Sequence, residues 1–99
     1  MKLSPYAIWS GLDAFSIEDA LEYIRRVEAA GYGSFWTREG FGRDPFTLLG
    51  MAAQQTSSLV LGTGIANIYG RDPAAMRSAA GTLHELAQGR SLLGLPAHL

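Results

Sequence analysis

Short apolar runs alternate with longer amphipathic segments along this chain. The runs Ala7–Trp9, Ser34–Thr37, Leu59–Ile65 and Ser91–Leu95 have the lengths of β-strands. Leu59–Ile65 is almost continuously apolar, which is typical of a strand covered on both faces. Between these runs, apolar residues recur at the three- and four-residue spacing that lines one face of a helix. The pattern therefore predicts strands and helices in strict alternation, with a strand first and last.

Residues that favour helix termini stand at the ends of these amphipathic segments. Ser16 is a candidate N-cap, and the pairs Asp44–Pro45 and Asp72–Pro73 each combine a capping carboxylate with a proline suited to the first turn. Gly31 and Gly89 follow the first and third segments, where a glycine can end a helix in the left-handed conformation. The apolar faces expected to be buried are Ile17, Ala20, Leu21, Ile24 and Val27 in the first helix, Phe46, Leu49, Ala52 and Ala53 in the second, and Met76, Ala79, Ala80, Leu83 and Leu86 in the third.

The helix-start pair recurs after an interval close to the roughly 30 residues of a βα unit. Short βα repeats predict a parallel sheet with right-handed crossovers, here with the strands in chain order and the helices on the outer face. A (β/α)8 TIM barrel needs about 250 residues. The sequence therefore predicts an α/β fold that is the first half of a TIM barrel, with residues 1–99 forming one partial domain.

Composition narrows the possible partners. Hydrophobic residues make up 47% of the 99 residues, the formal net charge is -1, and the basic residues form no run, so the charge pattern of a nucleic-acid binder is absent. The chain has no cysteine, which excludes disulfides and cysteine metal sites. Neither the apolar core of a signal peptide nor the roughly 20 apolar residues of a membrane span is present. We therefore expect a cytoplasmic protein that binds neither nucleic acid nor membranes.

The segment Leu59–Pro73 is the leading candidate for a functional loop. Here the third strand runs through Gly62 and Gly64 into a loop that precedes the next helix. Functional loops of parallel α/β proteins gather at this end of the sheet. The two glycines could instead relieve crowding where a helix packs closely. A dinucleotide fingerprint is excluded, because the third glycine and an immediate helix start are missing.

Three segments, Ala29–Trp36, Leu61–Pro73 and Leu86–Leu95, resemble the N-terminal half of the luciferase-like monooxygenase family in order and separation. The resemblance implies a TIM barrel that uses reduced FMN or the deazaflavin coenzyme F420 for hydride or oxygen chemistry on a small-molecule substrate. The segment from Gly62 to Asn67 is more similar to the deazaflavin-dependent branch than to the bacterial luciferases.

The same resemblance implies where a cofactor would lie. In the deazaflavin branch a bulge with a non-prolyl cis peptide after the third strand backs the cofactor ring, and the matching residues are Gly64 and Ile65. Asn67 would then be a polar contact beside the ring. Three further residues are expected near the mouths of the first two strands: Trp9, Trp36 and Glu39.

Several of these residues also have a purely structural interpretation. Phe35 and Trp36 alternate along one strand, so one is expected to face the sheet interior and the other the helix layer. Glu39 stands in a loop, where a carboxylate is more often solvated than catalytic. Neither His84 nor His98 can make a metal site alone, because a metal needs several converging ligands.

Two functions remain open at this point. In one, the chain is a flavin- or deazaflavin-dependent oxidoreductase module that works as a homo-oligomer or with a complementary C-terminal half-barrel. The later strands of the family, which supply most contacts to the cofactor phosphate and tail, would come from that partner. In the other, the chain is a truncated, non-catalytic half-barrel that self-associates.

Overall fold

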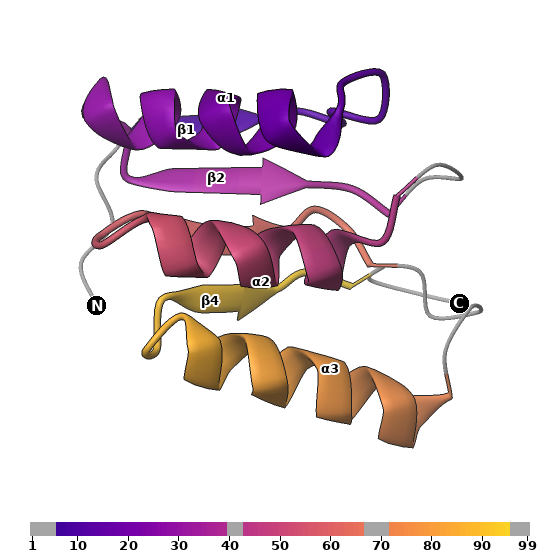
Figure 1. Cartoon of the computed structure of the whole chain (residues 1–99). Coiled ribbons are helices and arrows are strands. Elements are labelled where there is room, and N and C mark those ends of the chain that lie inside the picture. The colour runs from indigo at the N-terminus through magenta and orange to yellow at the C-terminus, as the bar shows by residue number, and fades with distance from the viewer. Residues whose placement is uncertain (1–5, 40–42, 67–71, 96–99) are drawn as a thin grey trace.

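A computed structural model describes residues 6–39, 43–66 and 72–95 (Figure 1). Within these ranges a parallel sheet has the strand order β1-β2-β3-β4, which confirms the order predicted from the sequence. The elements are β1 (Ala7–Trp9), α1 (Ile17–Ala29), β2 (Ser34–Thr37), α2 (Pro45–Gln55), β3 (Val60–Thr63), α3 (Pro73–Leu86) and β4 (Ser91–Leu93).

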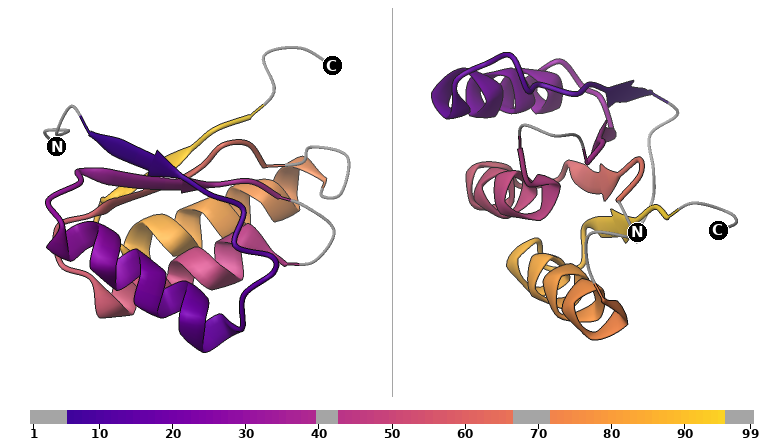
Figure 2. Two further views of the ribbon diagram at one scale, coloured as in Figure 1. Left: turned by 90° about the horizontal axis from the view of Figure 1, so that it is seen from above. Right: turned by 90° about the vertical axis from the view of Figure 1, so that its right-hand side faces the viewer.

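The fold has two layers. Figure 2 shows all the described helices on one side of the sheet, as predicted, while no described element covers the other side. The buried core lies between the layers: Phe35 and Leu61 of the sheet and Ile24 and Leu49 of the helices are all 0% exposed. On the uncovered side, the register places Trp9, Trp36, Gly62 and Leu92 in one row across the four described strands. The predicted alternation of Phe35 and Trp36 is thus confirmed.

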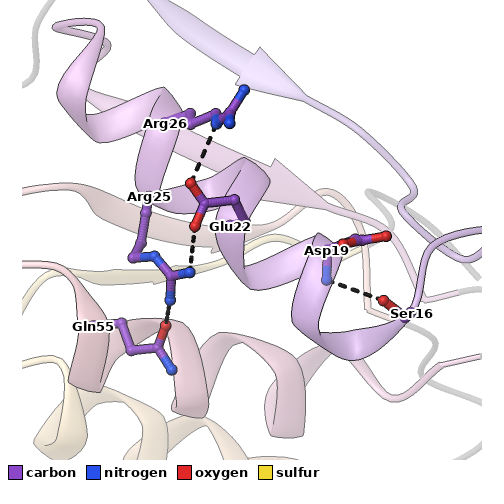
Figure 3. Close-up of polar contacts among 6 residues, drawn as sticks. All are labelled: Ser16, Asp19, Glu22, Arg25, Arg26 and Gln55. Atoms are coloured by element: carbon purple, nitrogen blue, oxygen red, sulfur yellow. Dashed lines mark hydrogen bonds and ion pairs between the residues drawn. The ribbon is translucent and has the colours of Figure 1, made fainter.

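The helices begin where the sequence predicted. Ser16, Asp44 and Asp72 each accept a hydrogen bond from the backbone N–H three residues later, at 3.1, 2.9 and 2.7 Å (the first is drawn in Figure 3). Gly31 and Gly89 follow their helices with φ angles of 93° and 86°, a conformation that glycine adopts without steric cost. Local capping therefore sets these boundaries.

Two predicted strands are longer than the observed ones. The structure ends β3 at Thr63 and β4 at Leu93, whereas the apolar runs extend to Ile65 and Leu95. After Thr63 the two strands are no longer joined by regular backbone pairing. The Thr63 hydroxyl instead hydrogen-bonds to the backbone of Gly94, which follows β4. Apolar character alone does not reveal where a strand stops pairing.

Two residues of the predicted buried faces are also exposed. Ile17 is 38% exposed and Leu86 is 41% exposed. Each stands in the terminal turn of its helix, where the helix has neighbours on fewer sides, so periodicity overestimates their burial. The predicted face of α2 is buried throughout.

Side chains also join the elements to one another. Arg25 on α1 donates hydrogen bonds to Glu22 of the same helix and to the side chain of Gln55 on α2 (Figure 3).

Among the described residues, no helix combines the length and the apolar character needed to span a membrane.

The connection from α2 to β3 is held by two charged side chains. The Glu28 carboxylate accepts backbone N–H groups from Ser57, Ser58 and Leu59 at 3.0, 2.8 and 2.8 Å. Arg90 donates to the carbonyls of Leu59, Ala53 and Thr56 at 2.7, 3.2 and 3.4 Å, and so satisfies groups at the end of α2. These contacts lie at the amino end of the sheet, where such residues commonly serve stability.

Candidate functional site

The carboxyl ends of the strands, at the right of Figure 1, are joined by the segment 63–66, which begins at the last residue of β3. The Gly64 N–H donates to the carbonyl of Thr37 at 2.8 Å, and the Ala66 N–H donates to the carbonyl of Gly94 at 2.9 Å. The segment is therefore fastened to the chain on both sides of β3.

Ile65 is the most exposed residue of this segment. The peptide bond between Gly64 and Ile65 is cis, the geometry that the resemblance implied. The Ile65 carbonyl accepts the backbone N–H of Glu39 at 3.1 Å, while the residue as a whole is 46% exposed. The segment thus presents apolar surface at the carboxyl end of the sheet while its polar backbone is hydrogen-bonded.

Trp9 lies beside the same segment. Its indole Nε1–H donates to the Gly64 carbonyl at 2.7 Å. A Cβ atom built on Gly64 would stand 3.2 Å from that nitrogen, so the glycine allows the close approach. Trp9 itself is 56% exposed. The structure therefore brings together three of the residues predicted for the site: Trp9, Gly64 and Ile65.

The structure adds a charged pair that sequence reasoning missed. The guanidinium carbon of Arg38 stands 5.9 Å from the ring centroid of Trp9, within the range of a cation–π contact. Arg38 also forms an ion pair with Asp13 at 3.9 Å. The signal that could have indicated these residues is their position, since each follows a strand at the functional end of the sheet.

Trp36 stands next to last in β2, in register with Trp9, and its ring is turned toward the start of that strand. Its ring lies against Gly62, where a Cβ atom would come within 2.4 Å of ring carbons. Its indole N–H donates to the Ser34 hydroxyl at 2.9 Å, toward the amino end of β2. The ring is thus directed along the strand rather than toward the loops that follow it.

The two remaining predicted residues are Glu39 and Asn67. Glu39 is partly buried, and its backbone N–H brings it next to Ile65. Asn67 lies outside the described residues. In the described ranges, no three His, Asp or Glu side chains gather closely enough to hold a metal ion.

Hydrogen bonds between Thr63 and Gly94 join the end of β3 to the residue that follows β4, beside the site. The Thr63 hydroxyl accepts the Gly94 N–H at 2.8 Å and donates to the Gly94 carbonyl at 3.0 Å. A Cβ atom on Gly94 would stand only 2.1 Å from the Thr63 carbonyl oxygen, so no side chain fits there. The sequence signal is a lone glycine directly after a strand, which often marks a close backbone approach.

The loop after β1 is held by Arg43, which lies between β2 and α2. Arg43 donates to the carbonyls of Leu12 and Phe15 at 2.9 and 2.6 Å. Leu12 is buried and has a φ angle of 48°, in the left-handed region. These contacts place Asp13 within reach of Arg38.

A separate groove of about 730 Å³ lies on the helical side of the sheet, between α3 and β4. Met76, Ala80 and Leu93 form part of its apolar lining, and His84 and Ser91 hydrogen-bond at 2.7 Å within it. The groove flanks β4, the last strand of the described sheet, and includes none of the predicted site residues.

Known proteins with similar sequences include a reductase and a putative oxidoreductase. A 5,10-methylenetetrahydromethanopterin reductase from Methanolobus tindarius is 36% identical over 74 residues, which are 74% of this chain and 23% of the reductase. A putative coenzyme F420-dependent oxidoreductase of Mycobacterium tuberculosis is also 36% identical over 74 residues, or 75% of this chain and 21% of that protein. The chain thus spans less than a quarter of the length of these relatives.

Solved structures show the same likeness in three dimensions. The coenzyme F420 dependent tetrahydromethanopterin reductase from Methanopyrus kandleri superimposes with a TM-score of 0.86 at 26% identity, over 95% of this chain and 27% of the reductase. The oxygenating constituent of 3,6-diketocamphane monooxygenase from Pseudomonas putida, in complex with FMN, gives a TM-score of 0.80 at 17% identity, a likeness of fold alone. It covers 99% of this chain and 30% of that protein.

The fold prediction is therefore confirmed, because the four parallel strands and intervening helices of the described residues match half of a TIM barrel. The sequence model of the family described as luciferase-like monooxygenase matches residues 3–97, nearly the whole chain. By this match, the protein belongs to the luciferase-like monooxygenase family.

Proposed function

We propose that this chain is a module of an F420- or FMN-dependent oxidoreductase that acts on a small-molecule substrate. In this proposal the segment 63–66 forms the wall against which the cofactor ring lies. The observation that carries it is Ile65, a half-exposed aliphatic residue at the functional end of the sheet whose flanking backbone groups are hydrogen-bonded within the protein.

The residues present fit a flat heteroaromatic ring. Ile65 offers an apolar surface to one face of such a ring, and the exposed indole of Trp9 lies next to it. Because the Gly64 and Ile65 carbonyls already accept hydrogen bonds, a ring stacked there would not bury unsatisfied acceptors. The bound cofactor supplies the hydride or oxygen chemistry, and the protein binds and orients it. Asn67 and Glu39 complete the proposed surroundings of the ring, and Trp36 contributes only its place beside Trp9, because its own ring turns toward Ser34.

Coenzyme F420 is the first candidate and FMN the second. Two relatives at 25% identity or more, the Mycobacterium tuberculosis and Methanopyrus kandleri proteins, have names that state F420. The FMN-bound neighbour is more distant at 17% identity.

The module is proposed to work with a partner, either a second copy of this chain or a complementary half-barrel. Trp9, Trp36 and Leu92 lie on the side of the sheet that no described helix covers. Uncovered apolar surface and unpaired strand edges favour association. The alternative function is a non-catalytic half-barrel, for which this surface serves self-association alone.

Titration of the purified chain with F420 and with FMN separates these two functions. Cofactor fluorescence is followed for the wild type, for Ile65→Ser, and for Leu86→Ser, which changes a similarly exposed aliphatic residue at the end of α3. We expect saturable binding that Ile65→Ser weakens roughly tenfold, since it loses apolar contact with the ring, and that Leu86→Ser leaves unchanged. Self-association without binding of either cofactor would favour the non-catalytic half-barrel.

A further inference from the structure

A side chain from β1 holds a backbone carbonyl that follows β3. The Trp9 indole N–H reaches the Gly64 carbonyl at 2.7 Å although the two residues are 55 positions apart in the sequence. Strand β2 lies between β1 and β3 in the sheet, so the indole bridges across a neighbouring strand. This contact is therefore a tertiary feature and does not belong to the pairing of the sheet.

The indole is itself restrained. The Arg38 guanidinium lies over its ring at 5.9 Å from the centroid and pairs with Asp13 at 3.9 Å. A Cβ atom on Gly11 would stand 3.1 Å from Nε of Arg38, so the missing side chain at Gly11 makes room for the guanidinium. Loops after β1 and β2 thus hold Trp9 in the orientation that reaches Gly64.

The bonds that hold the rest of the segment are of a different kind. Gly64 and Ala66 donate their backbone N–H groups to backbone carbonyls, and the Ile65 carbonyl accepts a backbone N–H. Those bonds are available whatever side chains surround them. The carbonyl of Gly64, which belongs to the same peptide unit as the Ile65 nitrogen, instead depends on the side chain of Trp9.

We infer that Trp9 is a positioning residue, which orients the Gly64–Ile65 peptide so that Ile65 presents its apolar surface to the cofactor ring. This inference rests on the proposed function. Without the indole N–H, the Gly64 carbonyl loses its protein partner and the peptide unit can rotate toward water. Affinity for the cofactor then falls because the wall is no longer preorganised.

The position of the Ile65 amide resonance tests the contact without any cofactor. In ¹⁵N-labelled protein, Trp9→Phe keeps an aromatic ring but removes the N–H, and Trp36→Phe removes the other indole N–H, which binds Ser34 instead. We expect the Ile65 amide resonance to move clearly in Trp9→Phe and to stay near its wild-type position in Trp36→Phe. An unmoved Ile65 resonance in folded Trp9→Phe overturns the inference.

A second variant keeps the test decisive if Trp9→Phe does not fold. Arg38→Met retains an unbranched side chain and removes the charge over the ring and the pair with Asp13. We expect the Trp9 indole N–H to exchange with solvent several-fold faster in this variant than in the wild type. An unchanged exchange rate means that Arg38 does not restrain the indole and overturns that part of the inference.

Binding measurements then separate this inference from the proposed function. If the wild type binds F420 or FMN, Trp9→Phe should weaken that binding roughly tenfold, the loss expected from one hydrogen bond that orients the site. Equal affinity of Trp9→Phe and the wild type overturns the positioning role and leaves the proposed function intact. Absence of binding by the wild type overturns cofactor binding by this chain, alone or self-associated, and with it the role assigned to Trp9.

Discussion

The ring of Trp36 lies so close to Gly62 on the neighbouring strand that a Cβ atom at Gly62 would stand 2.4 Å from two ring carbons. The glycine therefore serves close packing on the open side of the sheet. This outcome agrees with the structural alternative considered from the sequence, in which glycine relieves crowding, although the neighbour is an aromatic side chain and not a helix.

Gly62→Ala is expected to destabilise the protein by about 1–3 kcal/mol, because the Trp36 ring must leave its place. Denaturant unfolding measures the change. Gly81→Ala on α3 is the matched control: nothing lies within 4 Å of its Cβ, and the same substitution there should stabilise by about 0.5–1 kcal/mol. If Gly62→Ala is as stable as the wild type, Trp36 does not pack as described.

Gly94→Ala is expected to cost more than Gly62→Ala. The new methyl group would meet the Thr63 carbonyl at 2.1 Å, and a backbone oxygen cannot rotate aside as a ring can. The strands must therefore separate where β3 and β4 end. Hydrogen exchange of the Ala66 N–H, which donates to the Gly94 carbonyl, should accelerate at least tenfold, and an unchanged rate would contradict the close approach.

The carboxylate of Glu28 makes stability depend on pH. Partial burial acts to raise its pKa, but hydrogen bonds from the N–H groups of Ser58, Leu59 and Ser57 outweigh burial and hold the pKa below the ordinary glutamate value of 4.5. Because the folded-state pKa is lowered, the carboxylate stabilises the fold above that ordinary value. This stabilisation is lost as the pH falls through the folded-state pKa.

Glu28→Gln should therefore lower the free energy of unfolding at pH 7 by about 1–3 kcal/mol, since a neutral amide is a weaker acceptor for three N–H donors. The difference from the wild type should shrink as the pH falls below 4.5. Urea unfolding at several pH values measures it, with Glu85→Gln on α3 controlling for the loss of one exposed charge. A difference that stays constant down to pH 3 would contradict the assignment.

The edge at β4 is expected to support association between chains. Leu93 and Met76 line the groove beside this strand, and Leu93 is exposed. Sedimentation at low micromolar concentration should show a dimer or larger species, and Leu93→Lys should weaken association roughly tenfold by placing a charge at the edge. Met51→Lys changes a similarly exposed residue on α2 as a control. A stable wild-type monomer would refute this expectation.

Local features of the sequence determined the order of elements and most of their boundaries. The caps at Ser16, Asp44 and Asp72 and the closing glycines act within a few residues, so spacing alone predicts them. Family resemblance added the cis peptide bond between Gly64 and Ile65 and the expectation that Trp9 lies near the mouth of the first strand. Periodicity was wrong at Ile17 and Leu86, because burial in a terminal turn depends on neighbours that the pattern does not include.

Only the tertiary structure decided which side chains meet. Trp9 contacts Gly64 across 55 positions, and Thr63 contacts Gly94 across 31. Trp36 lies along its own strand because Gly62 on the next strand leaves room there, and Arg38 stacks on Trp9 because β1 and β2 pair in a particular register. The physical reason is that sequence patterns report interactions over one or two helical turns, whereas side-chain direction at the end of a sheet depends on shape and hydrogen-bond partners supplied by distant strands.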